Sequence, residues 1–357
     1  MASSPSMKTS ITLKELDNEP LLVVPQRYKR DDQEPSFFSD GNPMPVIPTV
    51  DMESLTLKET KAFDLQKLHS TCKTWGIFQL VNHGVSSSVM EKLKYEIEEF
   101  YKLPLEEKMR YELRPGDFEG YGQTILHSDD QKVDWADRFY MVFNPIHRRK
   151  PHLLPKLPSL LRESMETYFK EIQKLAMVLF NLMGEALGVD NKEMEDMFED
   201  GMQSVRMTYY PPCPQPELVM GISPHSDATG ITILSQVNGV EGFQVKKDGV
   251  WIPVNILPNA FVVIVGDILE ILSNGTYKSV EHRATVNSSK ERISIAIFFN
   301  PKFEAEIGPF TCTTTQESPP LFRRLRMEQY VKTFFSRKLD GKSFLKEMKI
   351  ERDTLTD

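Results

Sequence analysis

The chain has 357 residues, 40% of them hydrophobic and 26% charged, which is typical of a globular protein with one large core or two average domains. Its formal net charge of -8 and the lack of a basic block argue against nucleic acid or an anionic membrane as the partner. The three cysteines form no CxxC pair, and we see no secretory or membrane-spanning segment. We therefore expect a cytoplasmic protein, with a monomer as the default.

The first 200 residues are predicted to be an arm followed by helices. Residues 1–45 are rich in proline, serine and charge, which indicates an extended arm. Residues 46–200 form a mainly helical region. Apolar residues recur at three- and four-residue steps between Val89 and Phe100, so we predict an amphipathic helix that ends near Pro104. A longer helix with one apolar stripe is predicted over residues 160–187.

The pattern changes near Gln203, where short β-branched and aromatic runs alternate with turn dipeptides such as Asn238-Gly239 and Asp248-Gly249. Seven strands are predicted, over residues 205–210, 231–237, 242–245, 251–254, 261–265, 279–286 and 292–299. Short strands at this spacing favour a double-sheet jelly-roll core over residues 201–303. Residues 304–357 return to helical spacing and form a C-terminal helical segment.

His225-x-Asp227 together with His282 is the strongest chemical signal. Residues i and i+2 of an extended segment point to the same side, so His225 and Asp227 can bind one ion. Two neutral imidazoles and one carboxylate on one face, with open positions opposite, suit the Fe(II) oxygenases. The pattern also occurs in His127-x-Asp129, which lies in a polar stretch between helical segments. We interpret that second copy as a solvated loop.

Arg292-x-Ser294 forms a second pair with the same spacing. The apolar run that follows indicates burial, and a buried arginine needs an anionic partner. Its guanidinium offers a planar fork to a carboxylate, and the serine hydroxyl adds one donor. A surface charge beside a sheet is the alternative, which the neighbouring Lys290 and Glu291 permit. The two pairs in this order predict a metal centre next to a carboxylate-binding site.

Other segments carry a resemblance to a known family. They are Trp75–Val85 (WGIFQLVNHGV), Arg206–Pro214 (RMTYYPPCP), Pro258–Ala260 with Gly266-Asp267, and Leu339–Lys342 (LDGK). With the metal motif, they make the chain resemble, from about Pro45 to Ile350, the plant 2-oxoglutarate/Fe(II)-dependent dioxygenases of specialised metabolism. That family includes anthocyanidin synthase, flavonol synthase and the opiate O-demethylases.

The resemblance implies a fold, a cofactor set and a co-substrate site. The fold is a mainly β core with α, a distorted double-stranded β-helix flanked by N- and C-terminal helices. Iron is expected at His225, Asp227 and His282, with 2-oxoglutarate and O2 as co-substrates and ascorbate in support. The far carboxylate of 2-oxoglutarate or its surroundings is assigned to Arg292, Ser294, Tyr210 and Thr208. Thr208 departs from the family, which usually has asparagine there, so one donor and some reach are lost.

The resemblance also implies a substrate pocket, drawn from Tyr121, Ile125, Phe139, Met141, Phe298 and Asn300. This wall is mostly apolar or aromatic, and no basic cluster in the sequence suggests a highly anionic substrate. We therefore expect a small, mostly uncharged, ring-containing plant metabolite such as an alkaloid, phenolic or hormone, oxidised by hydroxylation or O-demethylation. Two alternatives stay open: a same-fold oxidase that does not use 2-oxoglutarate, and a catalytically silent small-molecule-binding protein.

Overall fold

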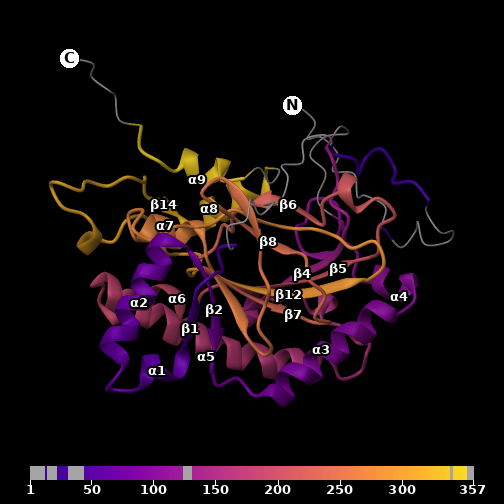
Figure 1. Ribbon diagram of the computed structural model, residues 1–357, viewed down its shortest axis with the longest axis horizontal. Helices are drawn as coiled ribbons and strands as arrows, with labels where there is room; N and C mark the ends of the chain where they lie inside the picture. Colours follow the sequence, from indigo (N-terminus) through magenta and orange to yellow (C-terminus); the bar gives the residue numbers. More distant parts are fainter. Residues whose placement is uncertain (1–12, 14–21, 31–43, 124–130, 338–340, 352–357) are drawn as a thin grey trace.

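A large sheet and a small sheet form the centre of the computed structural model, which describes residues 13, 22–30, 44–123, 131–337 and 341–351 (Figure 1). The large sheet has the order β1 (Thr49–Asp51), β2 (Ile77–Val81), β10 (Phe261–Val265), β7 (Ile231–Gln236), β12 (Arg292–Phe299), β5 (Gln203–Tyr210), β4 (Asp137–Asn144) and β3 (Gly120–Gly122). The small sheet has the order β6 (Ile222–His225), β11 (His282–Ala284), β8 (Phe243–Lys247) and β9 (Val250–Pro253).

The two faces of the large sheet belong to different cores. Successive side chains on a strand point to opposite faces, so Ile293, Ile295 and Ile297 of β12 enter the main core while Ala296 and Phe298 enter a second one. The second core also contains Phe243 and other residues of the small sheet, which places it between the sheets. The space between the sheets is therefore the interior of the jelly roll.

Helices cover the opposite face of the large sheet. The main core joins that face to α2 (Lys61–Thr74), α3 (Ser87–Lys102) and α5 (Leu161–Leu187), and Figure 1 shows α3 and α5 running along it. The other α-helices and strands of the described residues are α1 (Met52–Thr56), α4 (Leu105–Met109), α6 (Asn191–Phe198), α7 (Asp267–Leu272), α8 (Met327–Phe335), α9 (Ser343–Glu347), β13 (Glu306–Ile307) and β14 (Leu325–Arg326). Across the described ranges, every helix is too short or too polar to cross a bilayer.

The predicted fold class is confirmed, with differences in detail. All seven predicted strands occur, but β6 was not predicted, because Ser223 and Pro224 interrupt its apolar pattern. The region 46–200 contains the predicted helices and also contributes β1 to β4 to the large sheet. Its short apolar runs cannot be distinguished from helix by periodicity alone. The regions 46–200 and 201–303 therefore share one sheet.

Part of the N-terminal arm packs on the body of the protein. Residues 22–30 are described, and within them Val24 and Tyr28 are buried in a small core with Trp135 and Cys213. The Tyr28 and Trp135 rings meet edge to face with centroids 5.0 Å apart. The arm was predicted to be extended, and over these residues it instead forms a docked turn. Cys72, Cys213 and Cys312 are free thiols.

Candidate metal centre and active site

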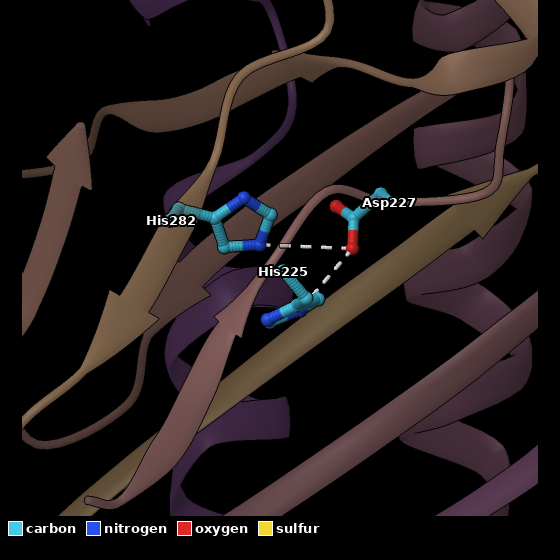
Figure 2. Close-up of side chains that lie close together, drawn as sticks. All are labelled: His225, Asp227 and His282. Atoms are coloured by element: carbon cyan, nitrogen blue, oxygen red, sulfur yellow. Dashed lines mark ion pairs between the residues drawn. The ribbon is translucent and has the colours of Figure 1, made fainter. Parts of the chain in front are cut away.

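Two strands of the small sheet bring three possible metal ligands together. His225 ends β6, His282 begins β11, and the antiparallel pairing places the two histidines directly opposite each other. Asp227 follows two residues after His225. Figure 2 shows both imidazoles turned toward one carboxylate oxygen, with each Nε2 3.6 Å from Asp227 Oδ1. All three residues are buried and their donor atoms lie within 4.8 Å of one another, so they could hold one metal ion.

Hydrogen bonds orient each of the three donors toward the centre. His225 Nδ1 lies 2.8 Å from the Ser223 carbonyl oxygen, and His282 Nδ1 lies 3.2 Å from that of Val280. An Nδ1–H that donates to a carbonyl leaves Nε2 as the free lone pair. Thr232 Oγ1 donates to Asp227 Oδ2 over 2.6 Å, which leaves Oδ1 for a metal.

The protonation states and an unsatisfied atom also fit a metal. Burial lowers the pKa of His282 to about 4, so its imidazole is neutral at physiological pH. Burial by itself would raise the pKa of Asp227, but the two histidines outweigh it and hold that pKa well below its usual range. His225 Nε2 is buried with no hydrogen-bond partner among the described residues. Buried polar atoms are normally satisfied, and a metal ion would satisfy this one.

The segment that carries the ligands is held in place by two further parts of the chain. The Asp267 amide donates to the Asp227 carbonyl over 2.7 Å, and Ser226 Oγ donates to the Asp267 carboxylate over 3.0 Å. From the C-terminal side, the Gly341 carbonyl accepts from the Ser226 amide. Lys342 Nζ forms an ion pair of 2.8 Å with Glu270 of α7. Two segments of the family resemblance, Gly266-Asp267 and Gly341-Lys342, thus support the metal centre.

A small cavity of about 30 Å³ adjoins the metal centre, and all four residues predicted to bind the co-substrate line it. On the paired strands β12 and β5, Arg292 lies opposite Tyr210 and Ser294 opposite Thr208, so the four face the same way. Arg292 is 1% exposed, and its Nε and Nη1 have no hydrogen-bond partner in the described parts of the chain. A buried guanidinium in this state is strongly unfavourable unless an anion binds it.

A larger cavity of about 120 Å³ also reaches His225 and Asp227, and it contains Phe298 and Asn300 from the predicted substrate pocket. The structure does not bring Tyr121, Phe139 or Met141 to this cavity. They lie on the helix-facing side of the large sheet, in the main core. The Phe139 ring stacks on Phe100 with centroids 5.4 Å apart. Ile125, His127 and Asp129 lie outside the described residues.

Several cavity residues were not identified from the sequence. Arg138 and Tyr140 of β4, Arg206 of β5, and Phe334 and Phe335 of α8 all line the larger cavity. Arg138 and Tyr140 occupy the strand positions that alternate with Phe139 and Met141, so they point to the opposite face. The alternation along β4 could have identified Arg138 and Tyr140 as one face of the strand. The sequence analysis instead assigned the face with Phe139 and Met141 to the substrate pocket, because the family resemblance implied it.

Replacing Thr232 with valine should weaken metal binding while leaving the fold intact. The change removes the hydrogen bond to Asp227 Oδ2 and keeps the side-chain shape, so the carboxylate loses its fixed orientation. Loss of such an outer partner typically lowers metal affinity by about 10- to 100-fold. Titration of the apo-protein with Fe(II) under nitrogen measures this. Thr167→Val, on the exposed side of α5, is the control. Equal affinities in both variants would contradict the assigned role of Thr232.

A double-sheet core with two histidines and one carboxylate converging in its interior defines a non-haem metal oxygenase. Comparison with family models agrees. Residues 201–301 match the 2OG-Fe(II) oxygenase superfamily, and residues 47–157 match the N-terminal region of the non-haem dioxygenase in morphine synthesis. The chain belongs to the 2OG-Fe(II) oxygenase superfamily. The predicted enzyme class, the Fe(II) cofactor and the 2-oxoglutarate co-substrate are thereby confirmed.

Similar proteins cover almost the whole chain. It is 49% identical over 355 residues to oxoglutarate-dependent flavonoid 7-O-demethylase 1 of Ocimum basilicum, which covers 98% of this chain and 95% of that protein. It is 48% identical over 344 residues to codeine O-demethylase of Papaver somniferum, covering 95% and 96%. The crystal structure of JOX2 in complex with 2OG, Fe and JA superimposes with a TM-score of 0.88 at 34% identity, covering 96% and 99%.

Proposed function

We propose that this dioxygenase oxidises a small, ring-containing plant metabolite by hydroxylation or oxidative O-demethylation. The observation that carries the proposal is a buried two-histidine, one-carboxylate centre shared by two cavities of different character. The smaller cavity presents the buried guanidinium of Arg292, two of whose nitrogens have no hydrogen-bond partner among the described residues, and the larger cavity has aromatic walls. Similar proteins named for flavonoid and codeine O-demethylation, and a similar structure with bound JA, support a plant metabolite of this kind.

Each part of the site has a distinct role in this proposal. His225, Asp227 and His282 would hold Fe(II), which, when bound, would supply the activation of O2 needed to oxidise a C–H bond with 2-oxoglutarate as co-substrate. Arg292 binds the far carboxylate of 2-oxoglutarate, with Ser294, Tyr210 and Thr208 beside it. The apolar walls of the larger cavity hold the substrate and exclude water.

The size and lining of the larger cavity favour a ring. An engineered cavity of about 150 Å³ in another protein holds benzene, so a volume of about 120 Å³ suits a compact ring system that extends toward the opening. Phe298, Tyr140 and Phe335 lie around this space. Aromatic faces stack on flat ligands. Asn300 adds a buried amide oxygen that has no partner among the described residues and can accept a hydrogen bond.

A metabolite panel with iron, ascorbate and 2-oxoglutarate tests the proposal. We expect one class of ring-containing metabolite to stimulate succinate release, and formaldehyde formation to distinguish O-demethylation from hydroxylation. Absence of stimulated succinate release with every member of the panel would contradict the proposed substrate class. A monomeric state, a cytoplasmic location and a supporting role for ascorbate are further parts of the proposal. Gel filtration, a fluorescent fusion and omission of ascorbate test them.

Phe298→Leu and Phe139→Leu should have opposite consequences, because the two rings lie on opposite faces of one sheet. Loss of the stacking ring at Phe298 should weaken substrate binding by about 5- to 10-fold, with 2-oxoglutarate affinity unchanged. Phe139→Leu should leave the substrate KM unchanged and lower the free energy of unfolding by about 1–2 kcal/mol. Steady-state kinetics and urea denaturation measure the two effects. A raised substrate KM in Phe139→Leu alone would show that the pocket lies on the other face.

A further inference from the structure

The larger cavity contains an unusual amount of positive charge. Arg138 of β4, Arg206 of β5 and Arg337, which follows α8, all line it. Among the described residues that line the cavity, Asp227 is the one carboxylate, and that group faces the metal centre. The sequence showed no basic cluster because these three arginines are far apart along the chain. Folding brings them together around the space assigned to the substrate.

Arg138 and Arg206 face the cavity from neighbouring strands. In the β4–β5 register Arg138 lies opposite Thr208 and Tyr140 lies opposite Arg206, so the two arginines are diagonal neighbours on one face of the sheet. The Arg206 guanidinium carbon lies 5.2 Å from the centre of the Phe298 ring. Arg206 Nε is buried and has no hydrogen-bond partner in the described parts of the chain.

The acidic groups near this pair already have other partners. Asp134 acts on Arg138 from a distance, but it forms an ion pair of 3.0 Å with Arg30 and also accepts from Ser223. Arg337, the third cavity arginine, pairs with Glu347. No ion pair of Arg138 or Arg206 is found within the described residues. Burial, with Arg206 nearby, lowers the pKa of Arg138 to about 10, so this guanidinium remains charged at neutral pH.

Binding of the cofactor and co-substrate would not neutralise this pair. The positive charges of divalent iron and Arg292 equal the negative charges of dianionic 2-oxoglutarate and Asp227, so these four groups together carry no net charge. Arg138 and Arg206 would then remain as two charges in a mostly apolar cavity without a counter-ion. Such charges are unfavourable unless a bound group compensates them. The cavity is therefore suited to a ligand that carries a negative charge.

We propose that the substrate carries a carboxylate that binds between Arg138 and Arg206, while its ring or alkyl body lies against Phe298. This inference rests on the proposed function and refines it, since the sequence alone led us to expect a mostly uncharged substrate. A guanidinium pairs with a carboxylate through two parallel hydrogen bonds, so two arginines fix both the position and the orientation of the acid. Such binding would determine which C–H bond faces the iron.

The test compares ring-containing carboxylic acids with their own methyl esters. Aryl- and cycloalkyl-alkanoic acids and the matching esters are titrated by calorimetry into the full chain loaded with Fe(II) and 2-oxoglutarate under nitrogen. We expect at least one acid to bind about 10-fold or more tightly than its ester. Arg138→Met keeps the length of the side chain. It should lower the affinity for that acid by about 10- to 100-fold and leave the affinity for the ester unchanged.

Two further variants complete the experiment. Arg138→Lys keeps the charge without the fork, so it should bind the acid with intermediate affinity. Arg162→Met, on the exposed side of α5, should bind both ligands as the wild type does. Equal binding of acids and esters, or an acid preference that persists in Arg138→Met, would overturn the proposal. Titration of 2-oxoglutarate into the iron-loaded chain is done first. If the iron-loaded chain does not bind 2-oxoglutarate, the proposed function is wrong, and the result says nothing against the inference about a substrate carboxylate.

Discussion

Alanine at His225, Asp227 or His282 is expected to reduce turnover by more than about 100-fold, beyond the range typical for the loss of a metal's outer partners. Each change removes one of the three donors, and the two that remain cannot fix the ion with its open positions directed at the cavities. The fold should persist, because the hydrophobic cores of both sheets lack these residues. Succinate release and bound iron, measured together with circular dichroism, check this result.

Two other histidines serve as controls for the metal prediction. His152 is exposed, and His127 belongs to the second His-x-Asp sequence, which lies outside the described residues. Alanine at either position should leave succinate release and iron content at wild-type levels. An inactive His127→Ala together with an active His225→Ala would show that we chose the wrong copy of the motif.

Arg292→Ala is expected to raise the concentration of 2-oxoglutarate needed for half-maximal activity by at least about 30-fold. Truncating one partner of a buried charge pair costs about 2–5 kcal/mol, and each 1.4 kcal/mol corresponds to about tenfold in affinity. Arg292→Lys should recover little of this loss, because an ammonium group lacks the planar fork. Calorimetric titration of the iron-loaded variants with 2-oxoglutarate separates binding from catalysis.

Two matched variants make the Arg292 result specific. Arg324→Ala removes an arginine whose side chain is 51% exposed, and its 2-oxoglutarate affinity should not change. Thr208→Asn restores the residue usual in the family at the same cavity and should bind 2-oxoglutarate at least as tightly as the wild type. An unchanged 2-oxoglutarate requirement in Arg292→Ala would rule out this arginine as the co-substrate anchor.

Some features of this protein follow from local geometry and were predictable. His225-x-Asp227 and Arg292-x-Ser294 each place two functional groups on one side of an extended segment, whatever the strand pairs with. The seven β-branched runs predicted the strands for a similar reason, since their residue types favour a pleated, half-buried surface. The structure has all seven strands and brings Arg292, Ser294, Tyr210 and Thr208 to one cavity.

The identity of β6 and the support of the metal centre depend on distant partners. β6 contains Ser223 and Pro224, so it is a strand mainly because it pairs with β11. Thr232, Asp267 and Gly341, from three separate parts of the chain, form hydrogen bonds with residues 226–227, the segment that carries the metal ligand Asp227. The sequence marked Asp267 and Gly341 only as points of resemblance, because hydrogen bonds between remote segments have no local pattern.

The sequence by itself predicted the fold class and the residues proposed for the metal and the co-substrate, whereas only the tertiary structure decided which face of β4 lines the larger cavity. β4 is buried on both sides, so polar and apolar residues do not alternate along it. A strand has a period of two, and an error of one position exchanges Arg138 and Tyr140 for Phe139 and Met141. The pairing with β5 sets that choice and brings Arg138 beside Arg206. The charge of the substrate cavity therefore arises from strand register, which depends on contacts between residues far apart in the chain.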